Sequence, residues 1–232
     1  MDHDAERHDP LGAEPVAPHV WRLPLRGVNA YAIETDQGIV LVDAGNPGDG
    51  PRILSMLHGV GLAPPRLILL THADVDHAGG VRALLRICAP EVRTTEGETS
   101  ILAGGGHPRL FRRLGRLLTG RIRCAAPVAI GDRTAGLLVV ATPGHTAGHC
   151  SFLREADGVL FAGDAAVVRS GEVGIPARLF TDDLAQAEAS LAHLADLGPR
   201  LLLPGHGAPL PEAASGLRKA VNATRSASAS GG

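Results

Sequence analysis

Hydrophobic residues fall into short runs that end at polar turns, and these runs alternate with segments of helical periodicity. Five runs in the first half predict strands, because each is short and is bounded by turn residues. The segments between them place apolar residues on one face of a helix. We expect strands at residues 20–25, 29–34, 39–42, 67–70 and 91–95, and helices at residues 52–60, 77–87 and 98–103.

The second half repeats this alternation. Strands are expected at residues 127–130, 137–142, 150–154, 159–162 and 201–203, and helices at residues 181–197 and 211–221. Thr181 is the predicted N-cap of the longer helix. Strands and helices that alternate with short connections indicate an α/β fold. We expect one domain over residues 18–222, preceded by a flexible arm at 1–17 and followed by a disordered tail at 223–232.

Residues 104–124 differ in character from the rest of the chain. They contain six arginines and no acidic residue, with leucines at near-helical spacing, and so predict a basic amphipathic helix. One interpretation is a charged face exposed to solvent above an apolar stripe. The other is an insertion or lid, whose arginines between Arg109 and Arg123 receive an anionic substrate or touch an acidic lipid surface. The pattern leaves both open.

Potential metal ligands cluster directly after the apolar run at residues 67–70, which is typical of a strand buried on both faces. The cluster consists of His72, Asp74, Asp76 and His77. Alone, it is equally well explained as a polar loop that caps the next helix. Later residues favour a site: His145, Asp164 and His206 each stand beside a glycine, where the backbone turns sharply and leaves a side chain in a cleft.

Together these motifs resemble those of the metallo-β-lactamase superfamily of metal-dependent hydrolases. The chain reads HADVDH at 72–77, GHTAGH at 144–149, GD at 163–164 and GH at 205–206. The superfamily pattern is HxHxDH, a later histidine in a GHTxGH context, a Gly-Asp and a last Gly-His. Four motifs in this order, over residues 18–210, make the resemblance specific. It implies a four-layer αββα sandwich.

The resemblance also implies a site for two divalent metal ions. His72, Asp74 and His145 would hold one ion, Asp76, His77 and His206 the other, and Asp164 would bridge them. Asp76 and Asp164 are the residues that we expect to be catalytic. A metal-bound hydroxide would attack the scissile bond, because a divalent ion lowers the pKa of bound water from ~15.7 to about 7 and polarises a carbonyl group.

Asp74 departs from the superfamily pattern, which has a histidine at this position. A third carboxylate adds negative charge, so bound water becomes less acidic and harder ions compete better with zinc. The shorter side chain also leaves open that the first site is weak or empty. We expect two zinc ions, with Mn²⁺ or Fe²⁺ as the alternatives that Asp74 favours.

Three residues near the motifs have predicted supporting roles. Asp43 is expected to orient a ligand histidine, although a simple turn residue is the alternative. His149 is interpreted as structural rather than as a ligand. Cys150 is interpreted as a buried thiol, since no basic partner for a thiolate is identifiable.

Composition narrows the classes of function. The formal net charge of -2 gives no electrostatic case for nucleic-acid binding, and no apolar window is long enough to span a membrane. The polar N-terminus lacks the features of a secretory signal, so a cytoplasmic location is expected. We predict a hydrolase acting on an ester, thioester or lactone of a small molecule. The alternatives are a di-iron oxidoreductase-like protein and a non-catalytic metal-binding member of the same fold.

Overall fold

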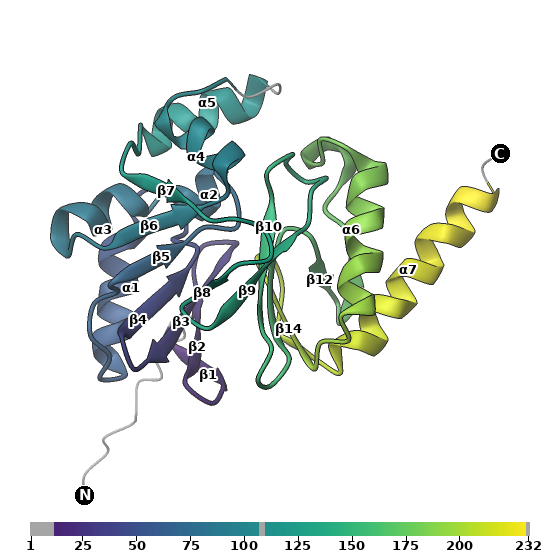
Figure 1. Cartoon of the computed structure of the whole chain (residues 1–232), viewed down its shortest axis with the longest axis horizontal. Helices are drawn as coiled ribbons and strands as arrows, with labels where there is room; N and C mark the ends of the chain where they lie inside the picture. Colours follow the sequence, from purple (N-terminus) through teal and green to yellow (C-terminus); the bar gives the residue numbers. More distant parts are fainter. Residues whose placement is uncertain (1–11, 107–109, 231–232) are drawn as a thin grey trace, which may run out of the picture.

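Two β-sheets packed face to face form the centre of the molecule (Figure 1). The structure is a computed structural model that describes residues 12–106 and 110–230. The strands of the first sheet lie in chain order: β1 (Glu14–Ala17), β2 (Val20–Pro24), β3 (Asn29–Thr35), β4 (Gly38–Val42), β5 (Leu67–Leu69), β6 (Glu91–Thr94) and β7 (Ala125–Pro127). The strands β4 to β7 are parallel, as expected where helices connect them.

The second sheet has the spatial order β15-β14-β11-β10-β9-β8. Its strands are β8 (Arg133–Thr134), β9 (Leu137–Ala141), β10 (Cys150–Arg154), β11 (Val159–Gly163), β14 (Leu201–Pro204) and β15 (Leu210–Pro211). Only β11 and β14 pair in parallel in this sheet, so their carboxyl ends lie at the same edge. A separate hairpin, β12 (Val167–Arg169) and β13 (Glu172–Gly174), follows β11.

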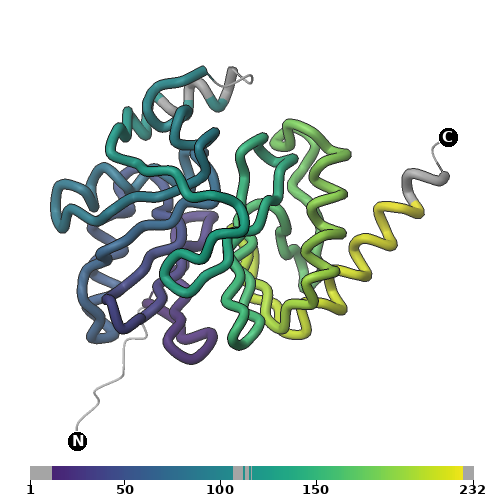
Figure 2. Tube along the Cα trace, viewed as in Figure 1, coloured from purple at the N-terminus to yellow at the C-terminus, as the bar shows by residue number. Residues whose placement is uncertain are grey.

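Helices cover the outer faces of both sheets (Figure 1). Those associated with the first half are α1 (Asp49–Gly59), α2 (Val75–Ala78), α3 (Val81–Ile87), α4 (Glu96–Ala103) and α5 (Leu110–Thr119). The second half contributes a short 3₁₀ turn (Arg178–Phe180), α6 (Leu184–Asp196) and α7 (Ala213–Ser230). After packing against α6, helix α7 extends away from the body of the molecule (Figure 2). Within the described residues, no helix is long and apolar enough to cross a membrane.

Three clusters of buried apolar side chains hold four layers together. One joins the first sheet to α1 and α3, and includes Ile53, Ile68 and Leu84. Another joins the second sheet to α6 and α7. The third lies between the sheets, with Phe152 and Phe161 as its largest fully buried side chains. Three interfaces between four layers define an αββα sandwich, which confirms the predicted fold class.

Element boundaries differ from the predictions in several places. The predicted helix at 77–87 is two helices, because the Gly80 amide donates to the Gly45 carbonyl at 3.3 Å instead of continuing one helix. The strand predicted at 127–130 lies at Ala125–Pro127 and belongs to the first sheet. Asp183, rather than Thr181, caps α6, since its carboxylate accepts from the Gln186 amide at 3.0 Å.

The chain ends also differ from the predictions. Within the predicted arm at 1–17, Glu14–Ala17 form an edge strand paired with β2, while residues 1–11 lie outside the described residues. Helix α7 runs through most of the predicted disordered tail at 223–232, as far as Ser230. Residues 231–232 lie outside the described part. The expected helix in the basic segment is confirmed as α5.

The cluster between the sheets is expected to dominate stability. Phe152 is fully buried on β10, so Phe152→Ala removes a large apolar side chain and leaves a cavity. We expect the free energy of unfolding, measured by urea denaturation, to fall by about 3–5 kcal/mol. The matched control is Ile130→Ala, at a position that is 52% exposed, where a change within about 0.5 kcal/mol is expected. Equal losses in the two variants would contradict this assignment of the core.

Candidate metal centre

The predicted ligands lie at strand ends of both halves. His72 and Asp74 follow β5, and Asp76 and His77 lie in α2. His145 lies in the loop between β9 and β10, Asp164 directly follows β11, and His206 follows β14. Ligand sites of α/β proteins form at the carboxyl ends of parallel strands, because loops from several strands converge there.

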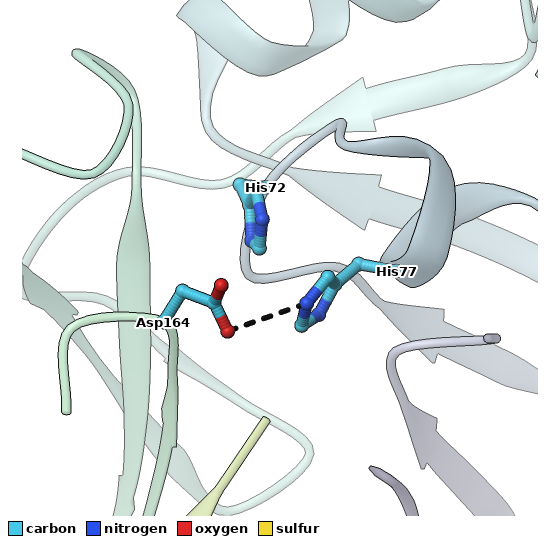
Figure 3. A group of neighbouring side chains, drawn as sticks. All are labelled: His72, His77 and Asp164. Carbon is cyan, nitrogen blue, oxygen red and sulfur yellow. Dashed lines mark ion pairs between the residues drawn. The ribbon is translucent and has the colours of Figure 1, made fainter. Parts of the chain in front are cut away.

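The structure brings all seven predicted ligands into three overlapping groups. These are His72, His77 and Asp164; His72, Asp74 and His145; and Asp76, His77 and His206. Within each group, the potential ligand atoms lie within 4.8 Å of one another. Figure 3 shows the first group, in which His77 Nε2 lies 3.3 Å from Asp164 Oδ1, so residues from the two halves face each other. The other two groups are those that the resemblance implies.

Several buried atoms of this centre are suited to a metal ion. Among the described side chains, His72 Nε2, His77 Nε2 and Asp164 Oδ1 are buried and form no hydrogen bond of good geometry, although the last two make an ion pair with each other at 3.3 Å. A buried polar atom without a partner costs about 1–3 kcal/mol, so such atoms are rare unless something else satisfies them. Imidazole nitrogens and carboxylate oxygens are ligands of zinc, manganese and iron. The donor set therefore fits a divalent ion.

Asp43 holds two segments of the ligand loop. It follows β4 with φ 58, in the left-handed region that Asp tolerates better than most residues. Its carboxylate accepts from the Thr71 amide at 2.9 Å and lies 2.8 Å from His77 Nδ1. The Asp43 carboxylate therefore orients the His77 ring, with Nε2 directed toward Asp164, as was predicted for a residue that supports a ligand.

His149 contacts the backbone of the predicted ligand Asp164. Its Nε2 accepts from the Asp164 amide at 3.0 Å, and its Nδ1 lies 2.8 Å from the Thr142 hydroxyl. Both ring nitrogens are thus used within the protein, which agrees with the structural interpretation of His149. Cys150 is fully buried, and burial raises the pKa of its thiol well above the usual value, so it is not a nucleophile.

Glu98 is a buried residue beside the candidate site whose role was not predicted from the sequence. Its fully buried carboxylate accepts from the Ala73 amide at 2.9 Å and from the Thr146 hydroxyl at 2.6 Å. It therefore joins the loop of Asp74 to the loop of His145. Burial raises its pKa, although these two hydrogen bonds partly offset that effect. A glutamate near the start of a helix is common, so no signal distinguished it.

His206 completes the centre from the second sheet. Its Nδ1 lies 2.7 Å from the Gly27 carbonyl, and its Nε2 lies 3.4 Å from both Asp76 Oδ2 and Asp164 Oδ2. Gly205 permits this approach, since a Cβ there would lie 2.5 Å from Asp164 Oδ1. The backbone at Gly205 thus packs directly against the buried carboxylate.

The histidines and carboxylates of the centre shift one another's pKa values. Burial lowers the pKa of His72 well below its usual value, and neighbouring histidines lower it further. Burial acts on His77 in the same direction, but Asp164, Asp43 and Asp76 outweigh it and raise its pKa well above the usual value. The histidines in turn hold the pKa values of Asp76 and Asp164 below their usual range, against the effect of burial. Both carboxylates are therefore ionised at neutral pH.

A cavity of about 470 Å³ opens onto the ligands. Asp74, Asp76, His145, Asp164 and His206 line it on one side. The remaining wall is largely apolar and comes from α2, α5, the β12 strand and the segment before α6. Its residues are Val75, Val167, Pro176, Ala177 and Phe180, with Arg112, Gly115 and Arg169 also present.

Arg112 is a second residue whose role was not predicted. It comes from α5, but its side chain is only 3% exposed and points into the centre, with Nε 2.9 Å from Asp74 Oδ2. Arg112 thus fits neither interpretation of the basic segment, since it is not solvated and contacts a predicted ligand. Six arginines in one segment gave no means of telling which one turns inward. Arg109 lies outside the described residues.

The family assignment rests on a match over most of the chain. Residues 23–206 match the model of the metallo-beta-lactamase superfamily. This range contains all seven predicted ligands, and the chain belongs to this superfamily.

Individual relatives support the assignment. The uncharacterized protein YobT of Bacillus subtilis (strain 168) is 32% identical over 87% of this chain and 94% of its own length. An atrochrysone carboxyl ACP thioesterase of Aspergillus fumigatus is 30% identical over 81% of this chain, which spans only 53% of that protein. A crystal structure of TTHA1623 in a di-iron-bound form has a TM-score of 0.66 and 29% identity, over 84% of this chain and 94% of that one.

Metal binding is expected to release protons and to strengthen as the pH rises. Hydrogen bonds to Asp164 and Asp76 outweigh burial and raise the pKa of His206 to about 10, and the pKa of His77 is raised as well. Both imidazole rings are therefore positively charged at neutral pH, whereas a histidine that binds a metal ion must be neutral. Between about pH 6 and about pH 8, the affinity for Zn²⁺ should rise roughly tenfold per pH unit for each proton displaced.

Calorimetry in buffers of different ionisation enthalpy counts the protons released. His206→Gln should release one proton fewer than the unmodified protein. An affinity that does not change over this pH range, with no proton release, would contradict the assignment of these histidines as ligands.

Removal of the charge of Asp43 is expected to weaken metal binding without unfolding the protein. Asp43→Asn keeps the shape of the side chain but weakens its hold on His77 Nδ1. Groups that orient a metal ligand typically contribute about 10–100-fold to metal affinity or activity, so a loss of that size in Zn²⁺ affinity is expected in a chelator competition titration. Asp36→Asn, in an exposed turn, is the matched control and should bind as the unmodified protein does.

Proposed function

We propose that the protein is a metal-dependent hydrolase that cleaves an ester, thioester or lactone bond of a small molecule. The observation that carries this proposal is the position of the predicted ligands at the wall of a largely apolar cavity of about 470 Å³. Cavities of this size hold small organic molecules, with a few polar groups to fix their orientation. Zinc, a cytoplasmic location and the roles of the individual ligands remain predictions.

Bound divalent ions would supply an acidified water and polarise the scissile carbonyl. The side chains predicted to hold them are those of the two groups formed by His72, Asp74 and His145 and by Asp76, His77 and His206, with Asp164 facing both. Asp43 and His149 fix the orientation of two members of this set, and Glu98 fixes the two loops. The chain thus contributes a prearranged set of ligands, whose geometry does not depend on mobile surface groups.

The residues of the cavity wall indicate which chemical groups the substrate would carry. Val75, Val167 and Phe180 offer apolar contacts for an acyl or alkyl group and displace water from the reacting bond. Arg169, an exposed residue at the end of β12, lines the same cavity and is suited to an anionic group of the substrate. The similarity to the Aspergillus fumigatus protein, a thioesterase, supports the inclusion of thioesters.

Asp164→Ala is expected to remove hydrolytic activity while leaving the fold intact. Asp164 has polar partners from both halves, so its loss disturbs every group of the centre. We expect kcat/KM to fall at least about 100-fold for any ester, thioester or lactone that the unmodified protein cleaves. His193→Ala, at an exposed position on α6, is the control and should keep full activity. Circular dichroism checks the fold, and full activity in chelator-treated protein would refute the mechanism.

An iron-dependent function is the second candidate. It is supported by the carboxylate at position 74, which favours harder ions, and by the similarity to TTHA1623 in its di-iron-bound form. Elemental analysis of protein purified without added metal distinguishes the two candidates. Zinc or manganese would direct the assays toward hydrolysis, whereas iron would direct them toward redox reactions.

A further inference from the structure

The Arg112 guanidinium contacts the same two atoms that the first predicted metal ion would use. Its Nε lies 2.9 Å from Asp74 Oδ2, and its Nη2 lies 3.0 Å from His145 Nε2. His145 Nε2 and Asp74 Oδ2 are 3.2 Å apart, and Asp74 Oδ2 is also 3.7 Å from His72 Nε2. The guanidinium therefore stands against the group formed by His72, Asp74 and His145.

The guanidinium and a metal ion would compete for the same atom, His145 Nε2. Arginine only donates hydrogen bonds, so His145 Nε2 must accept from Nη2. A neutral imidazole has one lone pair at its accepting nitrogen, and a metal ligand needs that same lone pair at about 2.0–2.1 Å. Nε2 of His145 cannot serve both partners at once.

Arg112 is firmly held in this position. Its Nη1 pairs with Asp182 at 3.0 Å and donates to the His145 carbonyl at 2.9 Å, while its Nη2 donates to the Phe180 carbonyl at 2.7 Å. A buried charge is tolerated only with such partners. Helix α5 reaches the ligand loop closely because Gly115 has no side chain, since a Cβ there would lie 3.3 Å from Val75 Cγ1.

We propose that Arg112 and a metal ion exclude each other at the group formed by His72, Asp74 and His145. The chain then binds one divalent ion tightly, at Asp76, His77 and His206. A second ion binds only when Arg112 is displaced from Asp74 and His145. In this arrangement Asp74 is the partner of an internal cation, which explains why an aspartate suits a position that is a histidine in the superfamily pattern. The inference concerns metal loading, and it can fail or hold whichever bond the enzyme cleaves.

The test is a Zn²⁺ titration of chelator-treated protein in competition with a chromophoric chelator, followed by elemental analysis after gel filtration. Arg112→Met keeps much of the apolar length of the side chain but removes the guanidinium. We expect this variant to bind the second Zn²⁺ roughly tenfold more tightly or better, because a charge-assisted hydrogen bond no longer competes, with little change in the first. Arg121→Met, an exposed arginine of the same segment, is the matched control and should leave both affinities unchanged.

Two further measurements separate exclusion from a structural role. Without metal, Arg112→Met should have a lower Tm than the unmodified protein, and saturating Zn²⁺ should raise its Tm by more. If this variant does not fold, Asp182→Asn loosens the guanidinium and should tighten the second Zn²⁺ by a smaller factor. A second affinity that is unchanged or weaker in the folded variants, or two equally tight ions in the unmodified protein, would overturn the proposal.

Discussion

Mutual neutralisation of buried charges is the constraint on which this centre depends. Asp164 is buried almost completely and faces the ring nitrogens of His77, His145 and His206. An isolated carboxylate in that position would be far too costly to ionise, and an isolated histidine would lose its proton. Asp164 and His77 keep their charges because they come from different halves of the molecule and face each other across the centre. The ligand geometry is therefore a property of the packed sandwich and not of any one loop.

Hydrogen bonds beside the site also hold the two halves of the molecule together. Tyr31 and Asn29 on β3 both donate to the Pro204 carbonyl, at 2.7 and 3.0 Å, and Asn29 also donates to the Gly207 carbonyl at 2.8 Å. The Cys150 amide donates to the Thr71 carbonyl at 3.0 Å. These bonds join the first sheet to the segments that carry His206 and His145. A rigid connection of this kind keeps the predicted ligands, which come from distant parts of the chain, close to one another.

The α/β alternation and the resemblance of four motifs to those of the superfamily were enough to predict the αββα fold and to select the candidate ligands. Apolar runs mark the strands, and a histidine or aspartate beside glycine marks where a strand delivers a side chain to the cleft. Local sequence patterns did not predict the features that depend on long-range contacts. Strand β7 joins the first sheet although it follows the basic segment, because its pairing with β6 is set by long-range contacts. Glu14–Ala17 form an edge strand that was not predicted, because four residues that include a proline are too short to show a strand periodicity. Glu98 and Arg112 resemble ordinary surface charges until the fold buries them.

The pairing of Asp74 with Arg112 gives the departure from the superfamily pattern a physical meaning. A histidine at position 74 would offer the buried guanidinium no negative charge, so Asp182 would have to offset more of the cost of burying Arg112. Conversely, an aspartate without Arg112 would place a third carboxylate beside Asp76 and Asp164 with no added cation. Each residue is therefore favourable only in the presence of the other. Asp74 and Arg112 therefore act as one unit between the ligand loop and α5. This unit determines how much of the positive charge in the centre comes from bound metal and how much comes from the Arg112 guanidinium.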